Sequence, residues 1–208
     1  MPRGSPERTQ IRKEEIMDAC EALYETMNFH DITLKEIGEV TSLSRPSIYN
    51  YFKTKEEIFL ALFEREYERW TEDLLQIQEE HEKLTCEQLA DLVALSLEKR
   101  KLLLKILSVN LYDMEENSRM ERLVSFKLAY KRSAEAVKAL VRKFCPEKDV
   151  NAVERFALVF LPFLHGVHPY AFSTPKQMEA MDQAGVPYGG LTIYSLVYEG
   201  MRNILNQA

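Results

Sequence analysis

The feature that most restricts the fold is an apolar repeat with helical spacing in the first half of the chain. Between Thr54 and Glu80, large apolar side chains recur every three or four residues: Phe59, Phe63, Tyr67, Trp70, Leu74 and Ile77. This spacing places them on one face of an α-helix. Thr54 and Glu57 have the spacing of a capping box, which predicts that the helix begins there. At 1.5 Å per residue, the helix would be roughly 35 to 40 Å long.

Similar repeats occupy most of the remaining sequence, and no alternating strand pattern lies between them. Thr85 with Gln88 and Ser118 with Glu121 have capping-box spacing and mark two further helix starts. Other helices are expected at about 9–27, 118–144, 150–165 and 192–206, with a short one that is capped by Thr174-Pro175 and Gln177 and ends at Gly185. The sequence therefore predicts an all-α fold.

Residues 33–55 predict two short helices joined by a tight turn. Thr33 and Glu36 have capping-box spacing and start the first helix. Ser44 is a suitable N-cap for the second helix, and Pro46 suits its first turn because no intrahelical amide is needed there. Ile48 and Phe52 lie four residues apart, so both can pack inward. This arrangement is a helix-turn-helix.

The side chains that this packing leaves toward solvent suit a DNA groove. Arginine can bind the acceptor edge of guanine, asparagine that of adenine, and hydroxyl groups reach phosphates. Val40 to Lys55 contains no acidic residue, so the segment can approach phosphate without local repulsion. We expect Arg45 to read a base edge, and Tyr49 and Lys55 to hold phosphates. The expected DNA contacts are Thr33, Ser44, Arg45, Pro46, Ser47, Tyr49, Asn50, Tyr51, Lys53 and Lys55.

The order of residues in this stretch is more specific than a general helix-turn-helix. Its signature is Thr33, Ile37-Gly38, Ser44, Ser47-Ile48-Tyr49, Tyr51-Phe52 and Lys55-Glu56. In this order the stretch resembles the N-terminal DNA-binding domain of the TetR family of transcriptional regulators. The resemblance implies a three-helix DNA-binding domain at 1–53 and a helical effector-binding and dimerisation domain at 54–208. Ser42 and Pro46 depart from the family pattern, which usually has Gly in the turn and a small residue in the second helix.

The resemblance also implies a function for the C-terminal part. Family members are dimeric regulators, so we expect a homodimeric repressor that a small apolar or amphipathic effector releases from a palindromic double-stranded DNA operator. Helices 150–165 and 192–206 carry enough apolar residues either for burial within one chain or for a four-helix dimer interface. The residues expected near the effector, which could equally form a solid core, are Trp70, Leu103, Leu107, Tyr112, Phe126, Tyr130, Phe160, Phe163, His165 and His168.

The search for catalytic and metal motifs leaves one alternative. No phosphate loop, nucleophile elbow or paired-cysteine motif is present, so we expect no catalytic residue, cofactor or metal. His165 and His168 lie three residues apart and could share a metal if their segment is helical. Gly166 and Pro169 argue against a regular helix there. The alternative function is therefore a helical metal-binding protein or enzyme that uses these two histidines.

Composition indicates a protein of the cytoplasm. The three cysteines, Cys20, Cys86 and Cys145, are far apart in sequence, which predicts free thiols in a reducing compartment. The first ten residues lack the apolar core of a signal peptide. The longest apolar run, Phe156–Leu164, contains Pro162 and is too short to span a membrane. The formal net charge of −6 is unusual for a DNA-binding protein, but the acid-free segment meets the phosphates locally.

Overall fold

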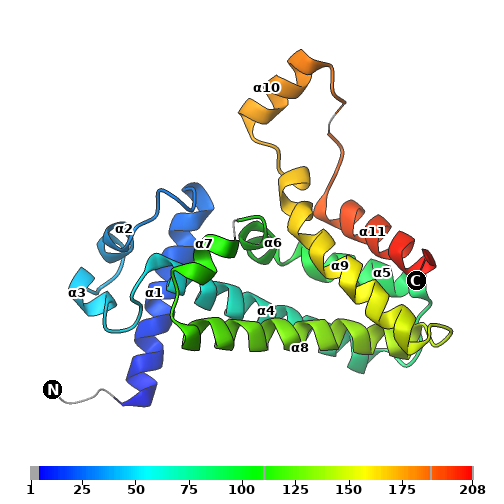
Figure 1. Cartoon of the computed structure of the whole chain (residues 1–208), viewed down its shortest axis with the longest axis horizontal. Helices are drawn as coiled ribbons and strands as arrows, with labels where there is room; N and C mark the ends of the chain where they lie inside the picture. Colours follow the sequence, from blue (N-terminus) through cyan, green and yellow to red (C-terminus); the bar gives the residue numbers. More distant parts are fainter. Residues whose placement is uncertain (1–4, 110, 188, 208) are drawn as a thin grey trace. The chain divides into compact units, whose positions relative to one another are not determined.

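The structure is a computed structural model that describes residues 5–109, 111–187 and 189–207. Within these ranges all regular secondary structure is α-helical, as the sequence predicts (Figure 1). The chain forms two compact units. Unit 1 contains the residues up to Arg65 together with Val109–Ala129, and unit 2 contains Glu66–Ser108 and the residues from Tyr130 onward. The sequence places the domain boundary after Lys53, just before the long helix Lys55–Glu80 begins. The two compact units divide after Arg65, inside this helix.

Unit 1 contains the predicted helix-turn-helix. Its elements are α1 (Pro6–Thr26), α2 (Leu34–Glu39), α3 (Arg45–Ile48), α7 (Leu111–Glu116) and the first parts of α4 (Lys55–Glu80) and α8 (Met120–Phe144). The first helix begins three residues earlier than expected because the Ser5 hydroxyl accepts the Arg8 amide at 3.3 Å and Pro6 occupies the first turn. The predicted start of α4 is confirmed, since the Thr54 hydroxyl accepts the Glu57 amide at 3.2 Å.

The core of unit 1 is built on aromatic rings and aliphatic side chains from several helices. Ile48 and Phe52 are both fully buried, as the sequence predicts. α3 itself ends at Ile48, and Phe52 lies in the turn that follows, where its amide donates to the Ile48 carbonyl at 3.0 Å. The Phe59 ring of α4 contacts Tyr24 at a centroid distance of 5.0 Å and Phe29 at 4.7 Å. Cys20 is also fully buried, and burial raises the pKa of its thiol. Edge-to-face ring packing of this kind fixes the helices against one another.

Three acidic side chains of α1 are bound by one arginine. Arg65 of α4 contacts Glu14 at 3.0 Å, Asp18 at 2.7 Å and Glu21 at 2.6 Å, and only 13% of its side chain is exposed. Low exposure makes these charge-assisted hydrogen bonds stronger than ordinary surface ion pairs. The acidic residues of α1 therefore hold this helix against α4, and their negative charge is partly compensated.

The start of α8 differs from the predicted capping box. The helix begins at Met120, and the backbone amide of Arg119 donates to the buried carboxylate of Glu57 at 3.2 Å. The Ser118 hydroxyl instead donates to the Met114 carbonyl at 2.7 Å, at the end of α7. The predicted role of Ser118 as the cap is wrong, because Glu57, distant in sequence, accepts the hydrogen bond at this helix start.

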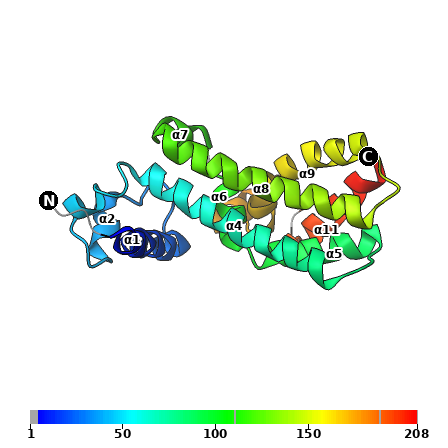
Figure 2. The same cartoon turned by 90° about the horizontal axis from the view of Figure 1, so that it is seen from below.

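Unit 2 is a bundle of helices around an apolar core. Its elements are the remaining parts of α4 and α8 together with α5 (Cys86–Glu98), α6 (Lys101–Leu107), α9 (Val150–Ala171), α10 (Pro175–Ala184) and α11 (Ile193–Gln207). The predicted capping box at the start of α5 is complete, with Thr85 and Gln88 each accepting the backbone amide of the other. α11 packs against α5 and α9, and α6 packs against α9 (Figure 2).

α9 is longer than predicted. It continues through Pro162 and Pro169 to Ala171, so the expected end near His165 is wrong. Both prolines are exposed, so the helix can absorb the loss of an amide donor on its solvent side. At 22 residues, α9 is the one described helix that is long and apolar enough to cross a membrane. One side of it is buried inside unit 2, as in the core helix of a folded domain.

α9 and α11 approach closely at one glycine. A Cβ atom on Gly200 of α11 would lie 2.6 Å from Cζ of Phe163 on α9, which is shorter than any normal contact. The missing side chain of Gly200 therefore makes room for the Phe163 ring.

α10 is capped as the sequence predicts but buries nothing. Thr174 and Gln177 form a complete capping box, Pro175 occupies the first turn, and Gly185 ends the helix with φ of 62°. A positive φ of this size favours glycine. No residue of α10 is buried, and the helix projects from α9 and α11 within unit 2 (Figure 1).

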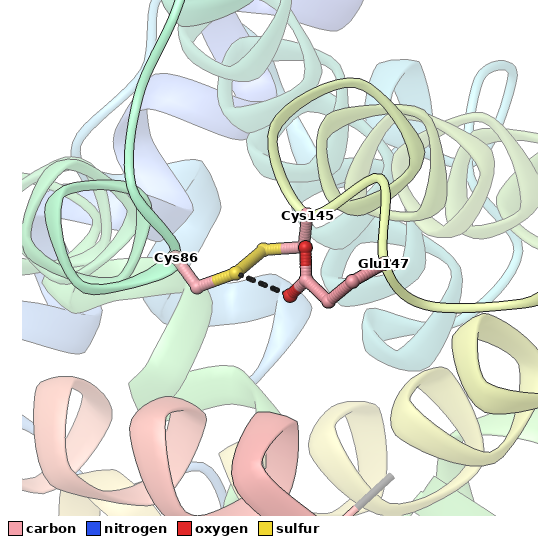
Figure 3. A group of neighbouring side chains, drawn as sticks. All are labelled: Cys86, Cys145 and Glu147. Carbon is pink, nitrogen blue, oxygen red and sulfur yellow. Dashed lines mark hydrogen bonds between the residues drawn. A yellow bond between two sulfur atoms is a disulfide. The ribbon is translucent and has the colours of Figure 1, made fainter.

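Two of the three cysteines form a disulfide. Cys86, the first residue of α5, is bonded to Cys145, which directly follows α8, and their Cα atoms are 5.6 Å apart (Figure 3). The expectation of three free thiols is wrong because the two residues, 59 positions apart in sequence, are brought together only by the fold.

Candidate DNA-binding and effector sites

The two short helices of unit 1 present the expected DNA-contacting residues. Thr33 caps α2 by accepting the Lys35 amide at 3.1 Å and also donates to the Glu36 carboxylate. Ser44 precedes α3 as predicted, but its hydroxyl makes no capping bond and lies 2.9 Å from the Ser47 hydroxyl. These hydroxyl groups are therefore at the beginning of each short helix, where phosphate oxygens are bound in many proteins.

The turn between α2 and α3 is held by α1. The Glu15 carboxylate accepts the Ser42 amide at 2.8 Å and the Ser42 hydroxyl at 2.6 Å, while Arg12 donates to the same hydroxyl at 2.9 Å. The hydrogen bonds from Ser42 lower the pKa of Glu15. No described non-glycine residue has a positive φ, so this turn needs no glycine at Ser42. Glu15 therefore fixes the turn that precedes α3, and nothing in the local sequence pattern indicates this role.

Arg45 and Tyr49 form a pair on the solvent side of α3. The Arg45 guanidinium donates to the Tyr49 hydroxyl at 3.2 Å and lies 5.7 Å from the centroid of the tyrosine ring. Arg45, Pro46 and Asn50 are exposed, and Tyr49 is partly exposed. This geometry holds a cation and a hydroxyl donor next to each other on one helix face.

The two lysines after α3 contact backbone carbonyl groups of unit 1. Lys53 donates to the Tyr49 carbonyl at 2.6 Å, at the C-terminal end of α3. Lys55 donates to the Phe29 carbonyl at 2.7 Å, and its ammonium group lies 4.5 Å from the Phe29 ring centroid. Lys55 thus binds the segment between α1 and α2, and its contact with phosphate stays a prediction.

α8 supplies a cation that sequence reasoning missed. The Arg122 guanidinium lies 5.0 Å from the ring centroid of Phe52 and donates to the Tyr51 carbonyl at 3.4 Å. Burial and then the positive charge of Arg122 lower the pKa of Lys13 on α1. Arg122 therefore contacts the end of the helix-turn-helix. Its sequence position, about seventy residues downstream of Tyr51, gives no signal for this contact.

The expected effector residues are distributed over both units. In unit 1, Phe126 is buried and contacts the Phe63 ring at 4.8 Å, whereas 79% of Tyr112 is exposed, so Tyr112 does not line the interior of this unit. In unit 2, Trp70 is fully buried and donates to the Ser96 hydroxyl at 3.1 Å. The others in unit 2 are Leu103 and Leu107 on α6, Tyr130 on α8, and Phe160, Phe163, His165 and His168 on α9.

The two histidines of α9 lie where α9 packs against α6. Nδ1 of His165 is 3.0 Å from the Leu107 carbonyl oxygen, and burial lowers the pKa of this histidine. Burial, assisted by the charge of Lys105, lowers the pKa of His168 to about 4. The His168 ring contacts Phe172 at a centroid distance of 4.8 Å. Both imidazoles are therefore neutral at pH 7 and offer polar atoms in a mostly apolar region.

In the described part of the chain, no group of three metal-ligating side chains includes His165 or His168. Cys86, Cys145 and Glu147 do form such a group, with ligand atoms within 4.8 Å of one another. In the disulfide state their two sulfur atoms are bonded to each other and are not thiolates, the form that binds metals.

Comparison with known proteins identifies the family. Residues 16–62 match the family described as "Bacterial regulatory proteins, tetR family", and residues 64–206 match the "Tetracyclin repressor-like, C-terminal domain". These two matches define the class as a DNA-binding transcriptional regulator. The chain belongs to the TetR family.

Individual relatives agree with this assignment. The chain is 30% identical over 63 residues to the "Uncharacterized HTH-type transcriptional regulator YfiR" of Bacillus subtilis, a match that covers 30% of this chain and 31% of that protein. The fold is similar to FadR, a fatty acid degradation regulator of Bacillus halodurans, with 15% identity, coverage of 99% and 97%, and a TM-score of 0.59. It is also similar to FadR of Thermus thermophilus, solved in complex with lauroyl-CoA, with 16% identity, coverage of 93% of both chains, and a TM-score of 0.57.

Proposed function

We propose that the protein is a dimeric, cytoplasmic repressor that binds a palindromic operator and is released from it by an amphipathic small molecule. The observation that carries the proposal is the exposed face of α3. Arg45 and Tyr49 share this face, the buried Ile48 and Phe52 anchor it, and Glu15 fixes the preceding turn. A rigid, acid-free helix face that presents an arginine is what direct readout of a major groove requires.

Dimerisation is proposed through a narrower surface than the sequence suggests. Phe156, Phe160 and Leu164 of α9 are buried inside unit 2, so they are unavailable to a partner. Leu158 and Val159 on the same helix are 74% and 53% exposed. Adjacent exposed apolar side chains on a long helix are the kind of surface that a second copy can cover in a two-fold dimer. Two symmetric reading helices would then require half-site centres about 34 Å apart.

The proposed effector has an apolar chain and a polar head. In unit 2, Trp70, Leu103, Leu107 and Phe160 provide apolar surface, and the neutral His168 provides polar atoms without a charge. Apolar side chains with a few uncharged polar atoms are the composition that suits a ligand with an apolar chain and a polar head. The structure of Thermus thermophilus FadR with lauroyl-CoA motivates long-chain acyl-CoA as the first compound to test.

The operator proposal is tested with a duplex selected from a random library. Arg45→Ala should cost about 1 to 3 kcal/mol on the selected site and lose discrimination at one base position. The control is Arg132→Ala, which removes a half-exposed arginine of unit 2 that pairs with Glu68. Equal weakening of selected and random duplexes by Arg45→Ala would contradict base reading.

The dimer and effector proposals have separate tests. Leu158→Arg should convert the dimer to a monomer in sedimentation, while Leu95→Arg, at a 40% exposed position of α5, serves as the control. A wild-type chain that is monomeric at micromolar concentration would contradict the dimer.

Saturating acyl-CoA should raise the apparent dissociation constant for the operator by about 5- to 150-fold, the usual range of coupling between two sites. Binding of acyl-CoA without any change in operator affinity would contradict its role as the effector.

A further inference from the structure

The Cys86–Cys145 disulfide has two ends with different access to solvent. Cys145 is fully buried, whereas Cys86 at the start of α5 is partly exposed. Disulfides are rare and usually transient in a reducing cytoplasm, where they take part in catalysis or redox sensing. A pair with one accessible and one buried sulfur is therefore suited to reversible exchange in which the accessible sulfur reacts first.

A cavity is lined in part by Cys86. It has a volume of about 200 Å³ and is lined by Cys86, Glu87, Arg202, Leu205 and Asn206. At roughly 30 Å³ per water molecule, this space corresponds to about six or seven waters, enough for part of a small thiol. Nη2 of Arg202 already donates to Glu199 at 2.8 Å, but its Nε is buried and has no hydrogen-bond partner among the described residues. This Nε and the Asn206 amide are hydrogen-bond donors that match carboxylate and amide oxygens.

Two opposing charges act on the Cys86 sulfur. The N-terminal amides of α5 favour a thiolate at its first residue. The Glu147 carboxylate lies 3.2 Å from Cys86 Sγ and opposes a second negative charge there (Figure 3). In the reduced protein the Cys86 thiol can donate to this carboxylate, so Glu147 restrains the reactivity of the thiol.

We propose that Cys86 is a thiol–disulfide exchange site for low-molecular-weight disulfides that carry carboxylate groups, with Cys145 as the resolving cysteine. The Cys86 thiolate attacks one sulfur of the disulfide RSSR, forming a Cys86–SR bond and releasing one RS⁻, which takes up a proton. The Cys145 thiolate then attacks the Cys86 sulfur, forming the Cys86–Cys145 bond and releasing the second RS⁻. The two cysteines lose two electrons and two protons, and RSSR becomes two RSH.

The exchange site is connected to α11 by polar contacts within unit 2. Tyr198 of α11 donates to Glu87 of α5 at 2.9 Å, and Tyr194 donates to Asp91 at 2.6 Å. An R group in the cavity lies between the start of α5 and the end of α11. If α11 contributes to the proposed dimer, the adduct also changes dimer stability, a consequence that rests on the proposed function.

The chemistry is tested by mass spectrometry on the reduced full-length chain treated with glutathione disulfide. The wild type should end as the internal disulfide without a retained adduct. Cys145→Ser should retain one glutathione adduct, because no resolving thiol remains, and Cys86→Ser should retain none over the same time. Cys20→Ser should behave as the wild type, since Cys20 is fully buried and is not part of the disulfide.

A charge substitution tests the role of Glu147. Glu147→Gln removes the negative charge beside Cys86 and should accelerate adduct formation by about threefold to tenfold, because a larger thiolate fraction is partly offset by lower nucleophilicity. Glu98→Gln, at the other end of α5, should leave the rate unchanged. These rates depend on neither DNA nor dimerisation, so failure of the proposed regulatory function leaves this test intact.

Two results would overturn the proposal. One is adduct formation in Cys86→Ser as fast as in Cys145→Ser, and the other is a wild type that keeps both thiols in excess glutathione disulfide. If Cys145→Ser does not fold, peptide mapping of wild-type protein quenched with acid early in the reaction replaces it. An early adduct on Cys86 then supports the proposal, and an early adduct on Cys145 or none at all refutes it.

Discussion

Replacing Glu57 by glutamine should destabilise unit 1 through the loss of one buried charge. Glu57 is fully buried and accepts four hydrogen bonds: from the Lys53 amide at 2.8 Å and from the Arg119 amide, Nε and Nη2 at 3.2, 2.6 and 2.8 Å. Burial alone would raise the pKa of this carboxyl group. The hydrogen bonds and charge of Arg119, together with the amides, outweigh burial and lower the pKa to about 2.

The pKa shift of Glu57 sets the size of the expected loss in the free energy of unfolding. A fall from the ordinary value of 4.5 to about 2 corresponds to about 3 kcal/mol of stabilisation when the carboxylate is charged. Because 46% of the Arg119 side chain is exposed, solvent screening reduces this to roughly 2 kcal/mol. The folded-state pKa is lower than the unfolded-state pKa, so the stabilisation is complete above pH 4.5 and is lost as the pH falls toward 2.

Urea unfolding at several pH values measures this contribution. Glu57→Gln should lower the free energy of unfolding by roughly 2 to 3 kcal/mol at pH 7, since its amide cannot accept every hydrogen bond that the carboxylate accepts. The difference from wild type should shrink between pH 4.5 and pH 2. Glu68→Gln is the matched control, because Glu68 and Arg132 are both about half exposed, and should cost less than about 1 kcal/mol.

Two outcomes would refute this reasoning. A Glu57→Gln variant as stable as Glu68→Gln at pH 7 would show that the interaction between the buried Glu57 carboxylate and Arg119 gives the fold no net stabilisation. A difference that stays constant as the medium is acidified would show that the effect is one of shape or packing and not of charge.

Three other perturbations have expected outcomes. Gly200→Ala should lower the free energy of unfolding by about 1 kcal/mol in chemical denaturation, because overpacking against Phe163 exceeds the gain in helix propensity. Adding Phe163→Leu to this variant should recover that loss. Reduction of Cys86–Cys145 should lower the free energy of unfolding by up to about 4 kcal/mol, the loop entropy of a 59-residue separation, which a melting curve with and without reductant measures. Because His168 has a folded-state pKa of about 4, below 6.5, its protonation should destabilise the protein as the pH falls from 6.5 to 4, and His168→Phe should remove that part of the pH dependence in thermal melts.

The parts of the fold that the sequence predicts correctly are those specified by neighbouring residues. The start of α4, the capping box of α5 and both ends of α10 depend on contacts only a few positions apart. The inward face of Ile48 and Phe52 follows from the helical period alone. For the same reason the residues on the outer face of α3 could be proposed without a structure.

The errors concern contacts between residues that are distant in sequence. The Glu57 carboxylate replaces the expected cap at Ser118, and Cys145 meets Cys86 only after the chain has folded. Glu15 holds the turn of the helix-turn-helix and Arg122 contacts its end, and neither residue belongs to a sequence motif that indicates this contact. α9 extends past its prolines because tertiary packing outweighs the local preference to stop.

α10 also indicates where the backbone should open most easily. Its ten residues are held by caps at both ends but bury no side chain, and a helix this short is only marginally stable in water without packing. Its amides should therefore exchange hydrogen for deuterium faster than those of α9 or α11. A protease at low concentration should make its first cut in this segment and leave two fragments that stay associated, because α11 remains packed against α5 and α9.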